Sequence, residues 1–485
     1  MQACHRLKVR VPVMSEIDPA DLETCLQVLA AVSTLPPEHP TFVAVRRASS
    51  KMAKEARRER RSQARAAVTA ADREVTAQTA TGSAVRIDDE TQGIPLVSSV
   101  VGATAGTLLR ARSCYVCKQR YVEVDAFYHQ LCPSCAAFNR AKRDARTDLT
   151  GRTALLTGGR AKIGMYIALR LLRDGAHTTI TTRFPSDAVR RFAAMPDSAD
   201  WLHRLRVVGV DLRDPAQVIA LADTVAAAGP LDILINNAAQ TVRRSPGSYS
   251  LLVEAEADPL PAGPMPEMIT LGSPHDAHPL ALAGAELTSL AVDVTSLALT
   301  AGSASPDRIA AGTAIDAAGL TPDLASINSW TQTVDQVDPI ELLEVQLCNQ
   351  TAPFILISRL RPAMAAAAAR RKYVVNVSAM EGQFSRAYKG AGHPHTNMSK
   401  AALNMLTRTS GAEMLSDGIL MTAVDTGWIT DERPHPMKIR LADEGFHAPL
   451  DLVDGAARVY DPIVRGEAGE DLHSCFLKDY SPSPW

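Results

Sequence analysis

Four of the eight cysteines stand in two Cys-x-x-Cys pairs. Cys114 and Cys117 form the first pair, Cys132 and Cys135 form the second, and fourteen residues separate the pairs. Two thiolates at this spacing can bind one ion from a tight turn, and two such turns complete the tetrahedral S4 shell that suits Zn²⁺. Four sulfurs leave no coordination position open, so the motif predicts a structural zinc site and not a catalytic one. Redox-active dithiols or a chance spacing are the alternatives.

A second group of reactive side chains lies around residue 400. Lys400 follows Thr396 by four residues, so both side chains would share one face of a helix, one turn apart. A threonine hydroxyl is much less acidic than a phenol and is not expected to replace one as a general acid. His395 adjoins Thr396, and its imidazole can exchange a proton near neutral pH. Either His395 takes part in acid–base chemistry or it is a loop residue without such a role.

A glycine-rich turn between a strand and a helix predicts a nucleotide site. Residues 153–157 have the pattern of a short strand, and three glycines fall within residues 158–164 before a helical pattern begins. At such a turn the backbone can approach a pyrophosphate, and the helix N-terminus favours its negative charge. The next strand ends in Arg183. An acid at this position would bind a ribose 2′-hydroxyl, whereas Arg can pair with a 2′-phosphate. With Arg160 and Lys162 in the turn, we expect NADP(H), with NAD(H) as the alternative.

These motifs, in this order, resemble those of the short-chain dehydrogenase/reductase family. Residues 157–164 resemble its T-G-x-x-x-G-x-G turn with Lys162 at the middle glycine, 231–239 resemble its N-N-A-G strand, 421–430 its P-G-x-x-x-T loop, and 398–407 its active-site helix. The resemblance implies a Rossmann-type fold that binds a nicotinamide dinucleotide. The implied cofactor residues are Gly158, Arg160, Lys162, Ile163, Gly164, Arg183, Asp211, Leu212, Asn237, Ala238, Ala239, Lys400 and Thr430.

The resemblance also implies a catalytic set of Asn, Ser, Tyr and Lys, of which this chain keeps only part. Asn349 and Lys400 match, whereas Thr396 stands in the position of the Tyr and Ala379 in that of the Ser. Ser378 comes one residue too early, and because strand side chains alternate it could serve only if the strand end bends. The candidate catalytic residues are Asn349, Ser378, His395, Thr396 and Lys400.

Alternating strand and helix patterns from residue 148 to the C-terminus predict an α/β fold, with a doubly wound parallel sheet and helices on both faces. A stretch at about 241–328, rich in Pro, Gly and Ala, interrupts this pattern, as a lid, a substrate loop or a disordered arm would. Residues 111–147 are expected to form the Cys4 zinc module. Residues 1–110 are expected to form a helical basic arm and a connector, with Asp18 as N-cap of a first helix.

Charge and composition limit the partners. The net charge of −2 gives no overall attraction to nucleic acid or membrane. The basic segment 46–65 would suit nucleic acid or an acidic partner, but without interleaved aromatic residues a solvated helix face or a subunit contact is favoured. The start shows no secretory signal and the chain has no apolar run of eighteen residues, so we expect a cytoplasmic location and no membrane partner.

The expected function is an atypical NADP(H)-dependent oxidoreductase that acts as a homo-oligomer on a small-molecule carbonyl or alcohol. Two alternatives remain: a non-catalytic nucleotide-binding scaffold or sensor, and a non-redox lyase or isomerase that uses the same pocket.

Overall fold

Apolar segments from residue 153 onward form a nine-stranded sheet in the computed structural model, which describes residues 17–83, 86, 98–271, 319–320, 323–386 and 388–485. The strand order is β11-β10-β9-β8-β6-β3-β4-β5-β7. All neighbouring strands are parallel except β10 and β11. The strands are β3 (Thr153–Leu156), β4 (His177–Thr182), β5 (Leu205–Gly209), β6 (Ile233–Asn236), β7 (Glu267–Thr270), β8 (Lys372–Ser378), β9 (Ile419–Asp425), β10 (Cys475–Lys478) and β11 (Ser481–Ser483).

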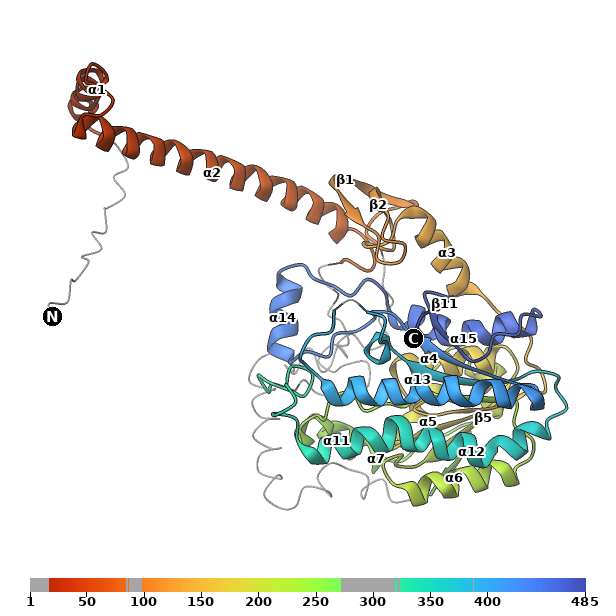
Figure 1. Cartoon of the computed structure of the whole chain (residues 1–485). Helices are drawn as coiled ribbons and strands as arrows, with labels where there is room; N and C mark the ends of the chain where they lie inside the picture. Colours follow the sequence, from red (N-terminus) through yellow and green to blue (C-terminus); the bar gives the residue numbers. More distant parts are fainter. Residues whose placement is uncertain (1–16, 84–85, 87–97, 272–318, 321–322, 387) are drawn as a thin grey trace, which may run out of the picture. The chain divides into compact units, whose positions relative to one another are not determined.

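Helices cover both faces of this sheet (Figure 1). One layer contains α4 (Lys162–Arg173), α5 (Pro185–Ala193) and α15 (Leu452–Glu467), and the other contains α6 (Pro215–Ala227), α12 (Ala352–Ala365) and α13 (Pro394–Met414). Each face has its own apolar core, one around Phe192 and Trp201 and one around Leu234 and Leu356. The predicted Rossmann-type α/β fold is therefore confirmed.

The stretch at 241–328 contributes to the sheet. Its first part forms α7 (Ser250–Glu256), which packs against α5, and β7, which adds an edge strand beside β5. A strand of four residues carries almost no periodic signal, so the sequence pattern gave no sign of it. Residues 272–318 lie outside the described residues. Two further helices, α11 (Pro339–Gln346) and α14 (His435–Asp443), lie in the segments that follow β7 and β9.

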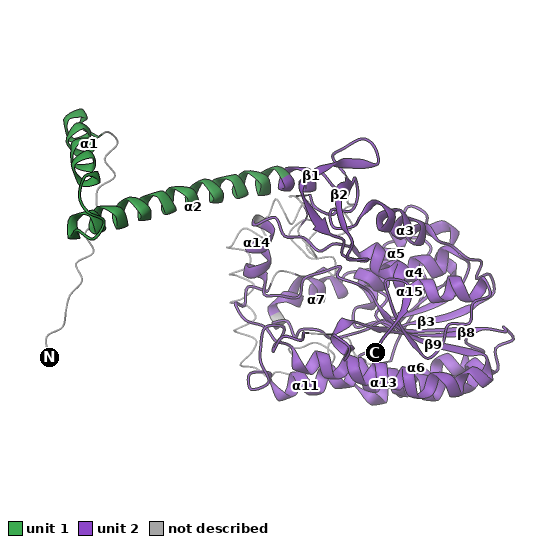
Figure 2. Cartoon of the chain, turned by 45° about the horizontal axis from the view of Figure 1, so that its top comes forward, with its two compact units in different colours: residues 1–71 green, residues 72–485 purple. Residues whose placement is uncertain are grey.

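The chain divides into two units, residues 1–71 and 72–485 (Figure 2). The first contains α1 (Pro19–Ser33) and most of α2 (Pro40–Ala77). Asp18 caps α1 by accepting a hydrogen bond from the backbone N–H of Ala20, as expected. Of the helices that the structure describes, none is both long and apolar enough to span a membrane.

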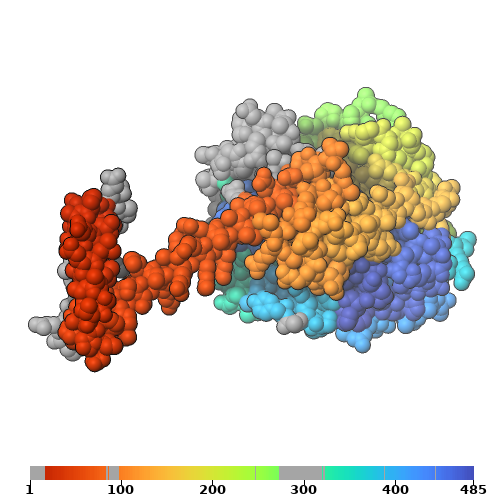
Figure 3. All heavy atoms as spheres, turned by 90° about the horizontal axis from the view of Figure 1, so that it is seen from above, coloured from red at the N-terminus to blue at the C-terminus, as the bar shows by residue number. Residues whose placement is uncertain are grey.

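A small module within the second unit carries the four paired cysteines. It consists of the antiparallel strands β1 (Thr104–Ser113) and β2 (Arg120–Asp125), followed by α3 (Pro133–Asp144). Cys114 and Cys117 lie in the turn between the strands, and Cys132 and Cys135 lie at the start of α3. Helix α3 packs against α15, and in the space-filling view the orange module borders the dark-blue C-terminal segment (Figure 3).

Candidate cofactor and active site

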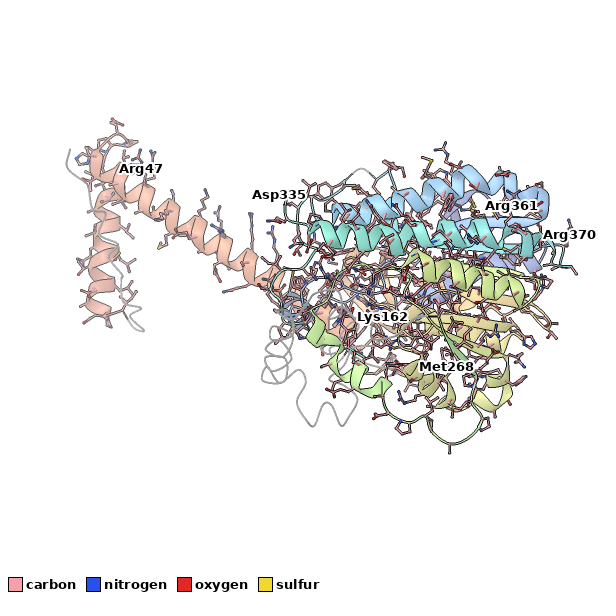
Figure 4. All side chains as sticks on the ribbon, turned by 90° about the horizontal axis from the view of Figure 1, so that it is seen from below. Arg47, Lys162, Met268, Asp335, Arg361 and Arg370 are labelled. Atoms are coloured by element: carbon pink, nitrogen blue, oxygen red, sulfur yellow. The ribbon has the colours of Figure 1, made fainter. Side chains whose placement is uncertain are left out.

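A cavity of about 380 Å³ opens at the carboxyl ends of the parallel strands. The order of the strands reverses between β3 and β6, and such a reversal leaves a crevice in which α/β proteins bind ligands. Figure 4 shows Lys162 at this end of the sheet, whereas Arg361 and Arg370 lie at the other end. Twelve of the expected cofactor residues line the cavity: Gly158, Arg160, Lys162, Ile163, Gly164, Arg183, Asp211, Leu212, Asn237, Ala238, Ala239 and Thr430.

The glycine turn brings two backbone segments too close for larger residues. Gly158 has φ +68°, and a Cβ there would lie 3.0 Å from the Cα of Ala238. A Cβ on Gly164 would lie 1.9 Å from the carbonyl oxygen of Gly158. Asn237 holds the turn, because its Nδ2 donates to the carbonyl oxygens of Thr157 and Gly158 at 3.0 and 3.1 Å.

Helix α4 begins at the cavity without a side-chain cap. Its N-cap, Ala161, has no side-chain acceptor for the first backbone N–H groups, which is the arrangement that binds a phosphate at a helix N-terminus. Lys162, where the family has a glycine, adopts φ +52°. This left-handed conformation costs a non-glycine residue about 1 kcal/mol, whereas glycine would adopt it without this cost.

Arg183 carries a positive charge that no carboxylate among the described residues neutralises. Its guanidinium lies 5.7 Å from the ring centre of Phe184 and 5.3 Å from that of Tyr249. The neighbouring cations differ: Arg160 pairs with Asp187 at 2.5 Å, and Arg213 pairs with Asp211 at 2.7 Å. Unlike Arg160 and Arg213, Arg183 is therefore placed to receive an anionic group of a ligand.

Asp211 lines the cavity, but its carboxylate is occupied. It accepts hydrogen bonds from the backbone N–H and the guanidinium of Arg213. Arg213 reaches on to Glu344 at 3.1 Å, and Glu344 accepts from the side chain of Gln240 at 2.8 Å. A chain of charged and polar side chains thus connects Asp211 with Gln240 across the cavity lining.

Asn349 fixes the backbone beside the cavity. It lies in a π-helical turn, Leu347–Thr351. Its Nδ2 donates to the carbonyl oxygen of Gln240 at 2.9 Å, and its Oδ1 accepts from the Gln240 N–H at 2.7 Å. This two-way pair holds the segment after β6, whose residues 240–244 line the cavity.

Lys400 is buried in α13, and its Nζ donates to the carbonyl oxygen of Val377 at 2.8 Å. Burial lowers the pKa of Lys400 to about 8, although Cys348 and Glu381 act in the opposite direction. Among the residues that the structure describes, Lys400 is the one expected cofactor residue that does not line the cavity.

Thr396 and His395 do not line the cavity, but Thr396 lies next to a residue that does. The Thr396 Oγ1 is 3.5 Å from the carbonyl oxygen of Thr241, a lining residue, and 3.5 Å from the His395 Nε2. His395 is 2% exposed, and its Nδ1 has no hydrogen-bond partner among the described residues. Burial, and then the neighbouring His393, lowers the pKa of His395.

Ser378 does not line the cavity. Its hydroxyl donates to the Oδ1 of Asn404, on α13, at 2.6 Å, so at the end of β8 its side chain is bound to a buried amide. Tyr388, the phenol nearest to Thr396 in the sequence on its N-terminal side, is 78% exposed.

Several lining residues carried little sequence signal. Phe184 and Tyr249 lie beside Arg183, Gln240 pairs with Asn349, and Cys348 precedes Asn349 in the chain. Phe184 follows Arg183 and Gln240 follows Ala239 in the chain, so proximity in sequence was a usable signal. Tyr249 comes from the stretch beyond β6, for which no local pattern pointed to the cavity.

The four paired cysteines converge in space. Their sulfur atoms lie within 4.8 Å of one another. The sulfurs of Cys117 and Cys132 are 3.7 Å apart. A tetrahedral ion with Zn–S bonds of about 2.3 Å requires sulfurs about 3.8 Å apart, so the Cys117–Cys132 pair has the spacing that a zinc site needs.

Comparisons with known proteins find short chain dehydrogenases over part of the chain and an uncharacterized relative over most of it. The short chain dehydrogenase family model matches residues 152–252. An uncharacterized protein of Acanthamoeba polyphaga mimivirus, R665, is 30% identical over 369 residues, which cover 73% of this chain and 71% of the viral protein. A probable oxidoreductase of Streptomyces antibioticus is 42% identical over 94 residues, 19% of this chain and 30% of that protein. The NADPH-bound carbonyl reductase from chicken fatty liver shares 19% identity, with 70% of this chain and 100% of that chain covered and a TM-score of 0.42.

Proposed function

Because the chain belongs to the short-chain dehydrogenase/reductase family, we propose that it is an NADP(H)-dependent oxidoreductase that interconverts a small-molecule carbonyl and its alcohol. The observation that carries the cofactor preference is Arg183, a cavity cation without a carboxylate partner among the described residues. A 2′-phosphate offers such a guanidinium a charge-assisted hydrogen bond, whereas a 2′-hydroxyl does not.

The cavity fits a dinucleotide at the other contact points as well. The backbone at Gly158 and Gly164 leaves no room for a Cβ, which suits the close approach of a pyrophosphate. The uncapped start of α4 and the Lys162 ammonium would hold its negative charge. Thr430, which lines the cavity, would bind the carboxamide end. Lys400, which lies outside the lining, would bind the nicotinamide ribose, as the resemblance implies.

Thr396 stands where the family has its catalytic Tyr, so in this proposal another residue donates the proton. When bound, the dinucleotide supplies the hydride to the carbonyl carbon. Thr396 hydrogen-bonds the substrate oxygen, and the proton passes to that oxygen from protonated His395 through the Thr396 hydroxyl, which leaves a neutral imidazole and an alcohol. The support is that His395 Nε2 and Thr396 Oγ1 lie 3.5 Å apart, and that Thr396 lies next to the lining residue Thr241.

Binding of NADPH and NADH to the wild-type protein and to Arg183→Leu tests the function. The substitution should raise the Kd for NADPH about 10- to 100-fold and leave the Kd for NADH unchanged, because only the phosphate contact is lost. Titration of nicotinamide fluorescence measures both constants, and Arg173→Leu, which removes an arginine paired with Asp197 outside the cavity, is the matched control. The proposal fails if the wild-type protein binds neither nucleotide or oxidises NADPH with no member of a carbonyl panel.

We also propose that the four cysteines hold a structural zinc ion. The donor set is soft and complete, and the 3.7 Å between the Cys117 and Cys132 sulfurs agrees with a tetrahedral S4 shell. Metal analysis of the purified protein should find one zinc per chain, and a metal-free preparation that is fully folded would contradict the site.

A further inference from the structure

The cysteine module contacts the loop that closes one side of the cavity. We call residues 426–432, which follow β9, the β9 loop; Ile429, Thr430 and Glu432 of this loop line the cavity. Tyr115 stands between the two cysteines of the first pair, and its hydroxyl oxygen accepts a hydrogen bond from the backbone N–H of Trp428 at 2.9 Å. One partly buried phenol thus connects a proposed metal-ligand turn to the wall of the proposed cofactor site.

Apolar packing strengthens this contact. Ile429 belongs to the same buried cluster as Cys114 and Cys132, together with Leu450. Gly427 has φ +77°, and a Cβ there would lie 2.6 Å from the Leu450 side chain and 3.6 Å from the Tyr115 oxygen. The β9 loop therefore packs against Tyr115 and against the apolar cluster that contains Cys114 and Cys132, and a shift of the module would displace the loop.

A second contact runs to the start of α15. The Tyr128 hydroxyl donates to Asp454 at 2.7 Å, and Arg143 of α3 pairs with Asp451, the N-cap of α15, at 2.6 Å. Leu452, the first residue of α15, lines the cavity. The module thus supports two separate segments of the cavity wall, the β9 loop and the N-terminus of α15.

A bound ion would fix the position from which Tyr115 acts. The module has only two strands and one helix, and a two-stranded hairpin is marginally stable on its own. Four metal–sulfur bonds would join the turn that carries Tyr115 to the start of α3, and structural metal sites of this kind supply folding free energy directly.

We infer that the cysteine module is a metal-dependent brace of the cofactor site, in which Tyr115 is a positioning residue and zinc occupancy sets the affinity for the dinucleotide. The ion takes no part in the chemistry. This inference rests on the proposed NADP(H) function.

The test uses the full-length protein, Tyr115→Phe and, as a matched control, Tyr121→Phe. Tyr121 is buried in the same module, but its hydroxyl donates to the carbonyl oxygen of His129 and not to the β9 loop. Tyr115→Phe leaves the Trp428 N–H without its acceptor, so the Kd for NADPH should rise about tenfold with zinc content unchanged. Tyr121→Phe should leave the Kd unchanged, and removal of zinc from the wild-type protein with a chelator should raise it at least as far as Tyr115→Phe does.

Hydrogen exchange of the β9 loop separates this inference from the function on which it rests. Faster exchange in residues 426–432 after zinc removal supports the brace, even in a protein that binds no nucleotide. A lack of nucleotide binding would overturn the proposed function alone. An unchanged exchange rate, or equal NADPH affinity in Tyr115→Phe and the wild-type protein, would overturn the brace and leave the oxidoreductase proposal intact.

Discussion

Lys400 is a buried cation, and no carboxylate of the described residues lies within hydrogen-bond distance of it. Its Nζ donates to the backbone carbonyl of Val377. Burial lowers its pKa from 10.5 to about 8, so the folded protein binds this proton less tightly than the unfolded chain does. The charge therefore destabilises the fold fully below pH 8, and this cost disappears as the pH rises from about 8 to 10.5. A residue that reduces stability in this way is expected where a bound ligand needs the charge.

Replacement of Lys400 by Met should separate stability from function. At pH 7 the variant should gain about 3 kcal/mol in free energy of unfolding, and its affinity for NADPH should fall. Urea denaturation at pH 7 and at pH 10 measures the gain, which should nearly vanish at the higher pH. Lys51→Met, on the exposed face of α2, should change neither quantity, and a Lys400→Met protein less stable than the wild type at pH 7 would refute the argument.

The proposed acid, His395, predicts a distinctive pH dependence. Its pKa lies below the ordinary 6.5 because the ring is buried and His393 is nearby, so the protonated form becomes scarce as the pH rises through that lowered value. The rate of carbonyl reduction should therefore fall with rising pH across the range below 6.5, because the lowered pKa of His395 lies there. A pH profile of kcat measures this fall, and His395→Gln should lower kcat and remove the inflection. A flat wild-type profile over this range would exclude His395 as the proton donor.

At the scale of elements, local patterns predicted most of the nucleotide half. The strand β3, the glycine turn and α4 follow one another without interruption, so their periodicity and their glycines specify them directly. Arg183 was predictable for the same reason, as the residue that follows β4. The edge strand β7 was not, because its four residues are stabilised by pairing with β5 and not by a pattern of their own.

Contacts between distant elements account for the rest of what the sequence did not predict. Tyr115 and Trp428 are 313 positions apart, and no local spacing encodes that hydrogen bond. Asp211 was expected to face a ligand, but the structure adds Arg213, only two residues away, as its partner. Sequence reasoning thus located the cavity and failed at the pairing of charges within it, because pairing depends on side-chain directions that only the assembled loops define.

At the scale of the whole molecule, the two units differ in how they are stabilised. Residues 72–485 enclose the sheet, both of its cores and the cysteine module. In the first unit, the α1 residues Leu22, Leu26 and Leu29 are exposed, so the described part of this unit buries little apolar surface of its own. We therefore expect that removal of residues before position 72 leaves the stability of the second unit unchanged. Removal of the end of α2, which belongs to the second unit, should lower that stability.

Two truncations test this division. Deletion of residues 1–61 should leave the Tm and the Kd for NADPH of the remaining chain unchanged, because the removed residues lie outside the second unit. Deletion of residues 1–77 also removes Asp72, whose carboxylate accepts hydrogen bonds from the backbone N–H groups of Leu109 and Arg110 at 2.7 and 3.3 Å. Loss of this buried acceptor should destabilise β1 by about 1–3 kcal/mol and lower zinc retention, as calorimetry and metal analysis would measure. Equal Tm values for the two truncated proteins would show that Asp72 does not anchor the module, whereas a lower Tm after the shorter deletion would place part of the stability in the arm.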